Sequence, residues 1–503
     1  MSALTALMED SASVTVVLVF ATLLFLVLLF KPSSKGNKYK FPPGPRPWPI
    51  IGNINILNVQ QPHDTMCKLS EQYGDVFTFH MGTRKYVVIT GYEAVKQALI
   101  TQAEEFGERG ITPAIHLFVK SKGLVFGVGE SWKTMRRFTL TTLRDFGMGR
   151  STIEDRIVEE TQRLLDVFQQ HQGKPFDPTV NINSAVSNII CHLVFGHRFE
   201  YDDPVFLQLQ RRVNEVIQLI ASPELLVYNL FPKLGAMLAD VNKIKENLEK
   251  NRSYFGSVCH QHKAELNNND LRSFLDSFLA RQKEEESRNT NTYFDEENMV
   301  VTIANLFAAG TETTSTTLRW GLLFMMKYPH IQEKVHAEIE RVIGKDRPPR
   351  YEDRKSMPYT DAVVHEIQRF GNVLPSNLLH QTKEDTTFRG YHLPKGTPVI
   401  PLLTSVLFDK TQWETPYEFN PGHFLDAEGR FVKKDAFLPF SAGRRACVGE
   451  TLAKMELFLF FTALLQRFRF HPPQGIRSED LGLSSLPGLT NLPRPYELCA
   501  AVC

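Results

Sequence analysis

The segment from Phe440 to Gly449 constrains this chain of 503 residues more than any other part of its sequence. It reads Phe-Ser-Ala-Gly-Arg-Arg-Ala-Cys-Val-Gly, with Gly443 before Cys447 and Gly449 after it. Glycine lets the backbone approach a flat ligand closely because it carries no Cβ. Backbone N–H groups around a cysteine can point at its sulfur and tune the charge that it donates to a metal. Each of these residue types would have a role if Cys447 bound the iron of a flat macrocycle as a thiolate.

Two further side chains of the segment suit the same site. The planar guanidinium of Arg445 can donate two parallel hydrogen bonds to a carboxylate such as a haem propionate. The apolar ring of Phe440 would shield the sulfur from water. The alternative is that Cys447 is a small buried residue without a ligand, as many free cysteines are.

Composition excludes several classes of protein. The chain is 42% hydrophobic and 22% charged, with a formal net charge of +1, so it lacks the basic surplus of nucleic-acid binders. Its six cysteines have neither the spacing of a zinc site nor that of a disulfide framework. No glycine-rich fingerprint for a dinucleotide occurs, so electrons for redox chemistry must come from another protein.

The N-terminal region reads as a membrane anchor. Residues 11–30 carry no charge and are mostly Val, Leu and Phe. A helix of that length spans about 30 Å, enough to cross the hydrocarbon core. Lysines follow the run, which favours a cytosolic location for the rest of the chain. We expect residues 1–30 to be an uncleaved single-pass anchor; a cleaved signal is the alternative, disfavoured by the acidic residues before the run.

The anchor is followed by a linker and one folded body. Residues 31–49 are basic and then proline-rich, and such a segment is stiff and extended. Residues 50–503 show no later linker and no repeat. Their pattern of residue types predicts a mainly α-helical body with a smaller β portion. The predicted elements are a β-hairpin over 75–90, a helix from Glu93, a long functional loop over 107–129, a turn at 267–270, a charged loop over 284–293, and strands over 388–400.

A proline-free run from Phe294 to Tyr328 predicts one long helix, with acids at its start and a lysine at its end. Its middle holds Gly310, Glu312 and Thr313. A threonine in a locally opened helix can hydrogen-bond in place of the backbone. An acid next to a hydroxyl can deliver protons to bound dioxygen. The alternative is a threonine-rich helix with a satisfied buried acid.

Two helical side-chain pairs add to the pattern. Glu366 and Arg369 are spaced to form an ion pair on one helix face, although such pairs are common. Trp132 and Arg136 place two pure hydrogen-bond donors on one face, which suits a haem propionate. Each pair taken alone fits an ordinary surface helix.

Together these segments resemble the cytochrome P-450 family, in particular its microsomal family two and the fish-enriched subfamily K. The resemblance runs through nearly the whole chain, in the family's order, and implies the cytochrome P-450 fold. The segments that carry it are 132–136, 144–149, 309–314, 366–369, 419–426, 440–449 and 455–461.

The resemblance implies haem b as cofactor and Cys447 as its iron ligand. Glu366 and Arg369 resemble a structural brace behind the cysteine loop, in which His423 replaces the family's usual arginine. Leu379 stands where the family usually has proline, which leaves the geometry of that loop open. The residues that resemble the family's haem contacts are Trp132, Arg136, His380, Phe440, Gly443, Arg445 and Gly449.

The implied activity is NADPH- and O₂-dependent hydroxylation or epoxidation of lipophilic molecules such as xenobiotics, fatty acids or steroids. Glu312 and Thr313 would relay the protons. Residues 50–503 are then the catalytic domain, held at the endoplasmic reticulum membrane and partnered by a flavoprotein reductase, cytochrome b5 and membrane lipid. Apolar residues that resemble substrate contacts, each also an ordinary core type, are Ile111, Ile115, Phe118, Phe307, Ala308, Ala309, Val373, Leu378 and Leu489.

Basic residues beside the motifs form a candidate docking face for an acidic partner such as the reductase, with ordinary solvated charge as the alternative. They are Lys133, Arg137, Lys433, Lys434 and Arg444. Other functions stay open: a haem-thiolate isomerase that does not use O₂, a non-catalytic haem-binding sensor or carrier, and a membrane scaffold without haem. The pair Glu312–Thr313 disfavours the isomerase, because such relatives typically lack it.

Overall fold

The computed structural model describes residues 15, 19–22, 40–119, 122–149, 151–220, 222–288 and 292–503. The expected anchor over residues 1–30 lies largely outside these ranges. Within them, no helix has both the length and the apolar character needed to span a bilayer.

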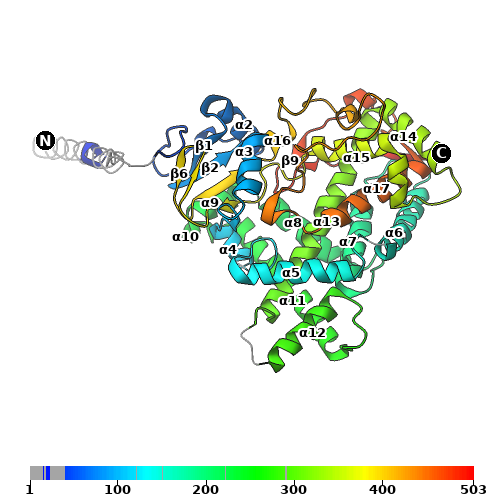
Figure 1. Cartoon of the computed structure of the whole chain (residues 1–503), viewed down its shortest axis with the longest axis horizontal. Coiled ribbons are helices and arrows are strands. Elements are labelled where there is room, and N and C mark those ends of the chain that lie inside the picture. The colour runs from blue at the N-terminus through cyan, green and yellow to red at the C-terminus, as the bar shows by residue number, and fades with distance from the viewer. Residues whose placement is uncertain are drawn as a thin grey trace, which may run out of the picture.

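The body is mainly helical, and Figure 1 shows its helices gathered around α13, with strands β1, β2 and β6 at the end where the chain enters. This agrees with the predicted mainly α-helical body with a smaller β portion. The helices are α2 (Pro62–Tyr73), α3 (Tyr92–Lys96), α4 (Pro113–Val119), α5 (Gly129–Asp145), α6 (Ser151–Gln170), α7 (Thr179–Phe195), α8 (Pro204–Leu219), α9 (Pro223–Leu230), α10 (Pro232–Gly235), α11 (Ala239–Glu265), α12 (Phe274–Ser287), α13 (Glu296–Lys327), α14 (Pro329–Val342), α15 (Pro358–Gly371), α16 (Thr404–Leu407) and α17 (Glu450–Arg467).

The largest sheet has the strand order β1-β2-β7-β4-β3. Its first two strands form the predicted antiparallel hairpin, with Val76 opposite Ile89 and Met81 opposite Arg84. The strands are β1 (Val76–Met81), β2 (Arg84–Ile89), β3 (Glu108–Arg109), β4 (His380–Gln381), β5 (Thr386–Phe388), β6 (Tyr391–Leu393), β7 (Pro398–Pro401), β8 (Phe468–His471), β9 (Ser485–Leu486), β10 (Leu492–Pro493) and β11 (Cys499–Val502).

The segment before the sheet lies against it. The hydroxyl of Thr78 in β1 donates to the carbonyl oxygen of Pro42 at 2.8 Å, and its backbone N–H donates to that of Pro43 at 2.6 Å. Part of the proline-rich stretch that we expected to act as a linker is therefore fixed to the folded body.

The predictions of a loop over 107–129 and over 284–293 were wrong in part. The stretch 107–129 contains strand β3 and helix α4, which begins at Pro113, where a proline favours helix initiation because its φ is already helical. The charged stretch after residue 284 continues α12 to Ser287. There Arg281 pairs with Glu284 at 2.8 Å, and ion pairs at this spacing stabilise a helix.

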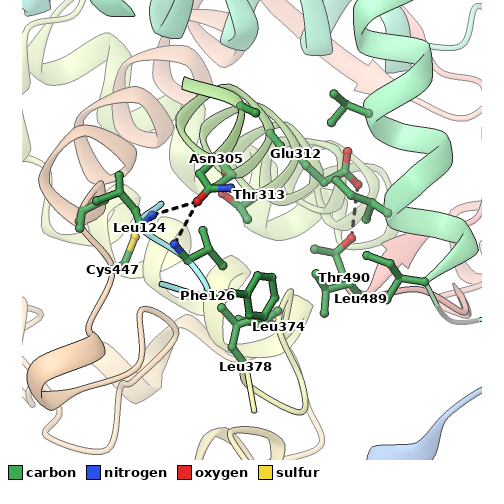
Figure 2. A pocket seen from close by; sticks show the side chains of 18 of the residues that line it. Leu124, Phe126, Asn305, Glu312, Thr313, Leu374, Leu378, Cys447, Leu489 and Thr490 are labelled. Carbon is green, nitrogen blue, oxygen red and sulfur yellow. Dashed lines mark hydrogen bonds between the residues drawn. The ribbon is translucent and has the colours of Figure 1, made fainter. Parts of the chain in front are cut away.

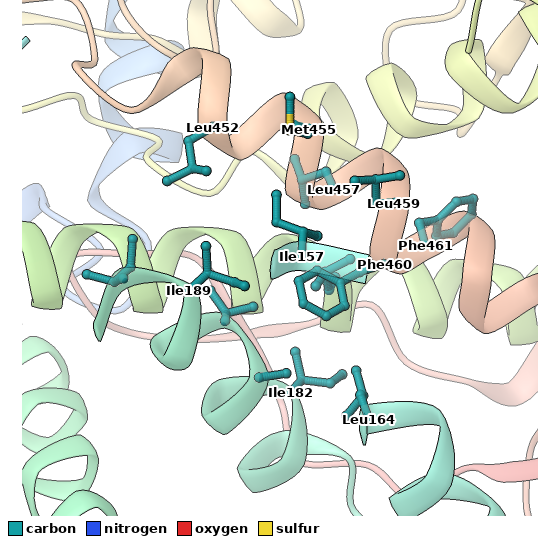
Figure 3. Packing of buried hydrophobic residues seen from close by; sticks show 14 of the residues in the cluster. Ile157, Leu164, Ile182, Ile189, Leu452, Met455, Leu457, Leu459, Phe460 and Phe461 are labelled. Atoms are coloured by element: carbon teal, nitrogen blue, oxygen red, sulfur yellow. The ribbon is translucent and has the colours of Figure 1, made fainter. Parts of the chain in front are cut away.

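The long helix predicted over 294–328 is confirmed as α13, capped by Asp295, whose side chain accepts from the N–H of Asn298. It packs closely on α7, because Gly310 has no Cβ and the space one would need is taken by Ile190. Apolar side chains of α17 pack against Ile157 of α6 and Ile189 of α7 (Figure 3). Burial of each large apolar side chain of this kind stabilises the folded state by about 1.5–3 kcal/mol relative to leaving it exposed.

Two asparagines of α13 hold the segment 122–126. Oδ1 of Asn305 accepts hydrogen bonds from the N–H groups of Leu124 and Val125 at 3.0 and 3.1 Å. Oδ1 of Asn298 accepts from the N–H of Gly123 at 3.2 Å. The loop before α5 is therefore fastened to the helix that carries the predicted acid and hydroxyl.

We predict that Asn305→Leu loosens this loop while Asn305→Asp does not, because aspartate keeps the accepting Oδ1. An unsatisfied buried N–H costs about 1–3 kcal/mol, so the amides of Leu124 and Val125 should exchange hydrogen roughly tenfold faster or more in the leucine variant. Hydrogen-exchange mass spectrometry over 122–128 measures this. Equal exchange in the two variants would contradict the fastening.

A candidate active site around Cys447

A cavity of about 530 Å³ lies between α13 and the cysteine loop. Of the predicted catalytic and haem-contacting residues, those that line it are Arg136, Glu312, Thr313, Phe440, Arg445 and Cys447, whereas Trp132, His380, Gly443 and Gly449 do not. Figure 2 shows Cys447 at one side, Glu312 and Thr313 on α13, and Leu374, Leu378 and Leu489 around the remaining space. Segments far apart in sequence thus meet at one apolar chamber with a thiol on its wall.

The cysteine loop has a specific backbone shape. Ser441 and Gly443 adopt positive φ of 59° and 70°. A Cβ at Gly443 would overlap the carbonyl oxygen of Leu99, so glycine is required there both by conformation and by space. The N–H of Cys447 donates to the carbonyl oxygen of Phe440 at 3.0 Å, which closes the loop. Gly449 then caps α17.

The thiol of Cys447 is exposed to the cavity. Desolvation, together with the charge of Glu450, raises the pKa of this thiol above its usual value. Hydrogen bonds from the backbone N–H groups of Gly449 and Glu450 and the positive charge of Arg136 oppose that rise without cancelling it. These N–H groups and the cation favour the thiolate, the form that binds a metal. A metal cation bound to the sulfur would favour the thiolate form further.

Donors without a hydrogen bond gather beside this loop. Within the described part of the chain, no hydrogen bond reaches Nε1 of Trp132, Nε2 of His380, or Nη1 and Nη2 of Arg445, although all are buried. Nη2 of Arg445 lies 3.7 Å from Oε2 of Glu108, as an ion pair longer than a hydrogen bond. Arg445 stacks over the ring of Trp132, with its guanidinium carbon 3.5 Å from the ring centre. Nδ1 of His380 donates to the carbonyl oxygen of Phe106 at 2.7 Å, so its unpaired Nε2 faces the same region.

Three guanidinium groups crowd this region. Burial, the positive charge of Arg109 and that of Arg136 lower the pKa of Arg445 to about 8, against the opposing effect of Glu108. Burial and Arg136 lower the pKa of Arg109 to about 9. Burial followed by the charge of Arg109 holds the pKa of His380 well below its usual range. The cluster therefore needs negative charge.

Haem fits both features of these residues, namely the donors without hydrogen bonds and the clustered positive charge. Its two propionates would satisfy the orphaned donors and neutralise the guanidinium cluster, and its iron would take the thiolate of Cys447. The residues that would hold it are Trp132, Arg136, His380 and Arg445, with Phe440, Gly443 and Gly449 shaping the cysteine loop.

Arg109 belongs to this cluster and was missed from the sequence. Its Nε donates to the carbonyl oxygen of Val125 at 3.0 Å, and it is buried at the cavity. The signal available was an arginine between two glycines, Gly107 and Gly110, inside a stretch that we interpreted as a loop.

The opposite wall presents the acid and the hydroxyl. Oγ1 of Thr313 donates to the carbonyl oxygen of Ala309 at 2.8 Å, the backbone partner that a helix-opening threonine uses. Oε1 of Glu312 accepts from Thr490 at 3.3 Å and from Thr316 at 3.5 Å. Burial raises the pKa of Glu312, against the lowering effects of Arg319 and these two hydroxyls.

Predicted substrate contacts divide into two groups. Ala308, Ala309, Val373, Leu378 and Leu489 line the cavity, as does Leu117. Ile111, Ile115 and Phe307 do not line it. Phe307 is fully buried on another face of α13, with its ring 6.0 Å from that of Phe255. The side chain of Phe118 lies outside the described part.

The predicted brace joins α15 to the segment 407–423. Both side chains of the pair Glu366–Arg369 are completely buried and joined by two hydrogen bonds of 2.7 Å. Arg369 also donates to the carbonyl oxygens of Leu407, Pro416 and Glu418. Nδ1 of His423 lies 3.3 Å from both carboxylate oxygens of Glu366. Histidine therefore does fill the third place in this brace.

The candidate docking residues differ in their surroundings. Lys133 pairs with Glu130, and Arg444 pairs with Glu104. Arg137 and Lys433 are exposed, and Lys434 is half-buried.

We predict that Arg369→Lys destabilises the fold by about 3 kcal/mol, because lysine cannot make the bidentate contact and leaves buried carbonyl oxygens unpaired. Urea unfolding of the purified protein measures this. Arg430→Lys is the matched control, since Arg430 pairs with Asp426 at the surface and should change stability by less than about 1 kcal/mol. Equal losses in both variants would contradict a structural role for the brace.

Comparison with known proteins agrees with this site. A family model described as cytochrome P450 matches residues 42–500. Cytochrome P450 2K1 of Oncorhynchus mykiss is 50% identical, over 99% of each chain. Cytochrome P450 2K6 of Danio rerio is 48% identical over 90% of each chain, and cytochrome P450 2F1 of Homo sapiens is 45% identical over 97% of this chain and 99% of its own. The chain therefore belongs to the cytochrome P450 family of haem-thiolate monooxygenases, whose members use haem b and receive electrons from NADPH through a flavoprotein reductase.

Proposed function

We propose that this chain hydroxylates or epoxidises lipophilic small molecules such as xenobiotics, fatty acids or steroids, at the expense of NADPH and O₂. The observation that carries the proposal is the single cavity with Cys447 on one wall and Glu312 and Thr313 on the other. Haem bound there supplies the activation of dioxygen, with the cysteine thiolate favouring O–O cleavage.

The side chains of this chain have separate roles in that reaction. Cys447 would hold the iron, and Trp132, Arg136, His380 and Arg445 would hold the propionates. Thr313 passes protons from its hydroxyl, which the carbonyl oxygen of Ala309 keeps in place at 2.8 Å. Glu312 supplies protons to that hydroxyl, and burial, which raises the pKa of its carboxyl, favours the protonated form.

The cavity wall favours apolar substrates. Leu117, Val373, Leu378 and Leu489 contribute aliphatic surface. Burial of such surface by a ligand stabilises its complex by roughly 25 cal/mol per Å². Ala308 and Ala309 of α13 line the same cavity, and their small side chains leave room for a substrate.

Membrane lipid and redox proteins are the proposed partners. Exposed apolar side chains occur on α10 and the preceding residue, namely Leu234 and Phe231, and near the chain entry at Trp48 and Ile50. These positions support attachment at the endoplasmic reticulum membrane together with an N-terminal single-pass anchor. The exposed cations Arg137 and Lys433 support docking of the reductase, and cytochrome b5 is a second electron donor of the same kind.

We predict that reduced wild-type protein with carbon monoxide shows the strongly red-shifted absorption band of a thiolate-ligated haem. Cys447→Ala should lose that band because the sulfur ligand is gone. Cys67→Ala, which removes a thiol remote from the cavity, is the control and should keep it. A band at the position typical of histidine ligation in folded wild-type protein would overturn the iron ligand.

We predict that Thr313→Ala reduces product formed per NADPH consumed by roughly tenfold, with hydrogen peroxide taking up the difference. Thr313→Ser keeps the hydroxyl and should retain most of the coupling. Parallel measurement of NADPH oxidation, product and peroxide decides the matter. Coupling at the wild-type level in the alanine variant would remove Thr313 from the proton relay.

A further inference from the structure

The tip of the β9–β10 hairpin joins several walls of the cavity. Leu489 donates from its N–H to the carbonyl oxygen of Ile217 in α8 at 3.4 Å. Asn491 donates from its N–H to that of Val373 at 2.9 Å, and its own carbonyl oxygen accepts from the indole N–H of Trp320 at 2.7 Å. The backbone of the tip is therefore fixed to α8, to the segment after α15, and to α13.

Thr490 lies at the centre of this tip and is 4% exposed. Its hydroxyl donates to Oε1 of Glu312, as Figure 2 shows. The other donor to Glu312 is Thr316, which belongs to α13 itself and reaches the same oxygen. Among the described residues, Thr490 is thus the donor that reaches Glu312 from outside its own helix, and Oε2 of Glu312 keeps no hydrogen bond.

This arrangement gives the carboxyl one anchored and one free oxygen. Glu312 is 4% exposed and lines the cavity, so bulk water does not fix its orientation. The hydroxyl of Thr490 fixes Oε1, and the free Oε2 is the oxygen that can exchange protons with Thr313 or with water in the cavity. Moving the hairpin tip would move the anchored oxygen and with it the free one.

The residue before Thr490 lines the same cavity. Leu489 contributes an aliphatic side chain to the wall, and it is covalently joined to the residue that anchors Glu312. A substrate that presses on Leu489 therefore acts on a backbone whose next hydroxyl holds the acid.

We propose that Thr490 is a positioning residue for Glu312, and that contact between substrate and Leu489 sets the orientation of the carboxyl through it. This rests on the proposed monooxygenase function and adds a control on proton delivery from the substrate-contacting hairpin. The orientation of the carboxyl would affect whether electrons from NADPH form hydroxylated product or hydrogen peroxide. Coupled turnover consumes substrate, O₂, NADPH and a proton to give hydroxylated product, water and NADP⁺. Uncoupled turnover consumes O₂, NADPH and a proton to give hydrogen peroxide and NADP⁺.

The first test compares Thr490→Val with Thr490→Ser in the haem-loaded full chain with reductase and NADPH. Valine keeps the shape but not the hydroxyl, so peroxide per NADPH should rise at least threefold. Serine keeps the hydroxyl and should restore the wild-type ratio. Ser485→Ala lies on the same hairpin, in β9, and is the matched control; it should leave the ratio unchanged.

The second test measures the pH dependence of the same ratio. The charged group that acts on Glu312 is Arg319 of its own helix, and the hydroxyls of Thr490 and Thr316 lower its pKa further. Loss of the Thr490 hydroxyl raises that pKa, so the midpoint of the dependence should move to higher pH in Thr490→Val and stay in place in Thr490→Ser. A purely steric role for the hairpin would not move it.

The third test asks whether Leu489 acts through Thr490. Leu489→Ala should alter the ratio in wild-type protein and have less than half that effect when Thr490 is already valine. Additive effects, or a serine variant that behaves like valine, would overturn the proposal. Failure of the monooxygenase function itself looks different: wild-type protein would then form no product from any lipophilic substrate although its carbon monoxide spectrum is that of a thiolate-ligated haem.

Discussion

Crowded positive charge beside the cysteine loop is the constraint on which the rest of the site depends. Arg109, Arg136 and Arg445 come from three separate parts of the chain. Burial lowers the pKa of each, and repulsion by neighbouring arginines lowers the pKa of Arg109 and Arg445 further. Such a cluster is unfavourable until a dianion joins it. Haem propionates would meet that need, and binding of haem would then stabilise the folded state.

The sequence predicted the elements whose function depends on local spacing. The cysteine loop needs glycines at fixed offsets from the cysteine. Acidic residues at one end and a lysine at the other predict the bounds of α13. The pairing of Glu366 with Arg369 could be predicted because residues three apart lie side by side on a helix. In each case the residues that act together lie within a few positions of one another, so their relation is set by backbone geometry alone.

What the sequence did not reveal depends on contacts between distant segments. Arg109 acquires its role only because β3 brings it against α5 and the cysteine loop. Thr490 meets Glu312 across the gap between the hairpin and α13, and nothing in a Leu-Thr-Asn turn indicates an acid as partner. Phe307 shows the converse error: it adjoins the cavity-lining Ala308 in sequence, yet one helical step of about 100° separates the two side chains, and Phe307 is buried in the core.

Helix α13 carries both the wall of the cavity and the proton chemistry because one stripe of its surface combines small and polar side chains. Asn305 fastens the loop 122–126, Ala308 and Ala309 leave space, and Glu312 and Thr313 follow on the same stripe. Each polar group on the stripe is tied to a partner, Asn305 to loop amides and Thr313 to a helix carbonyl oxygen. Glu312 is the acid of this stripe, and the hairpin that holds it places Leu489 on the cavity wall. Control of proton delivery by the ligand would therefore enter through that acid, while the remainder of the helix stays fixed.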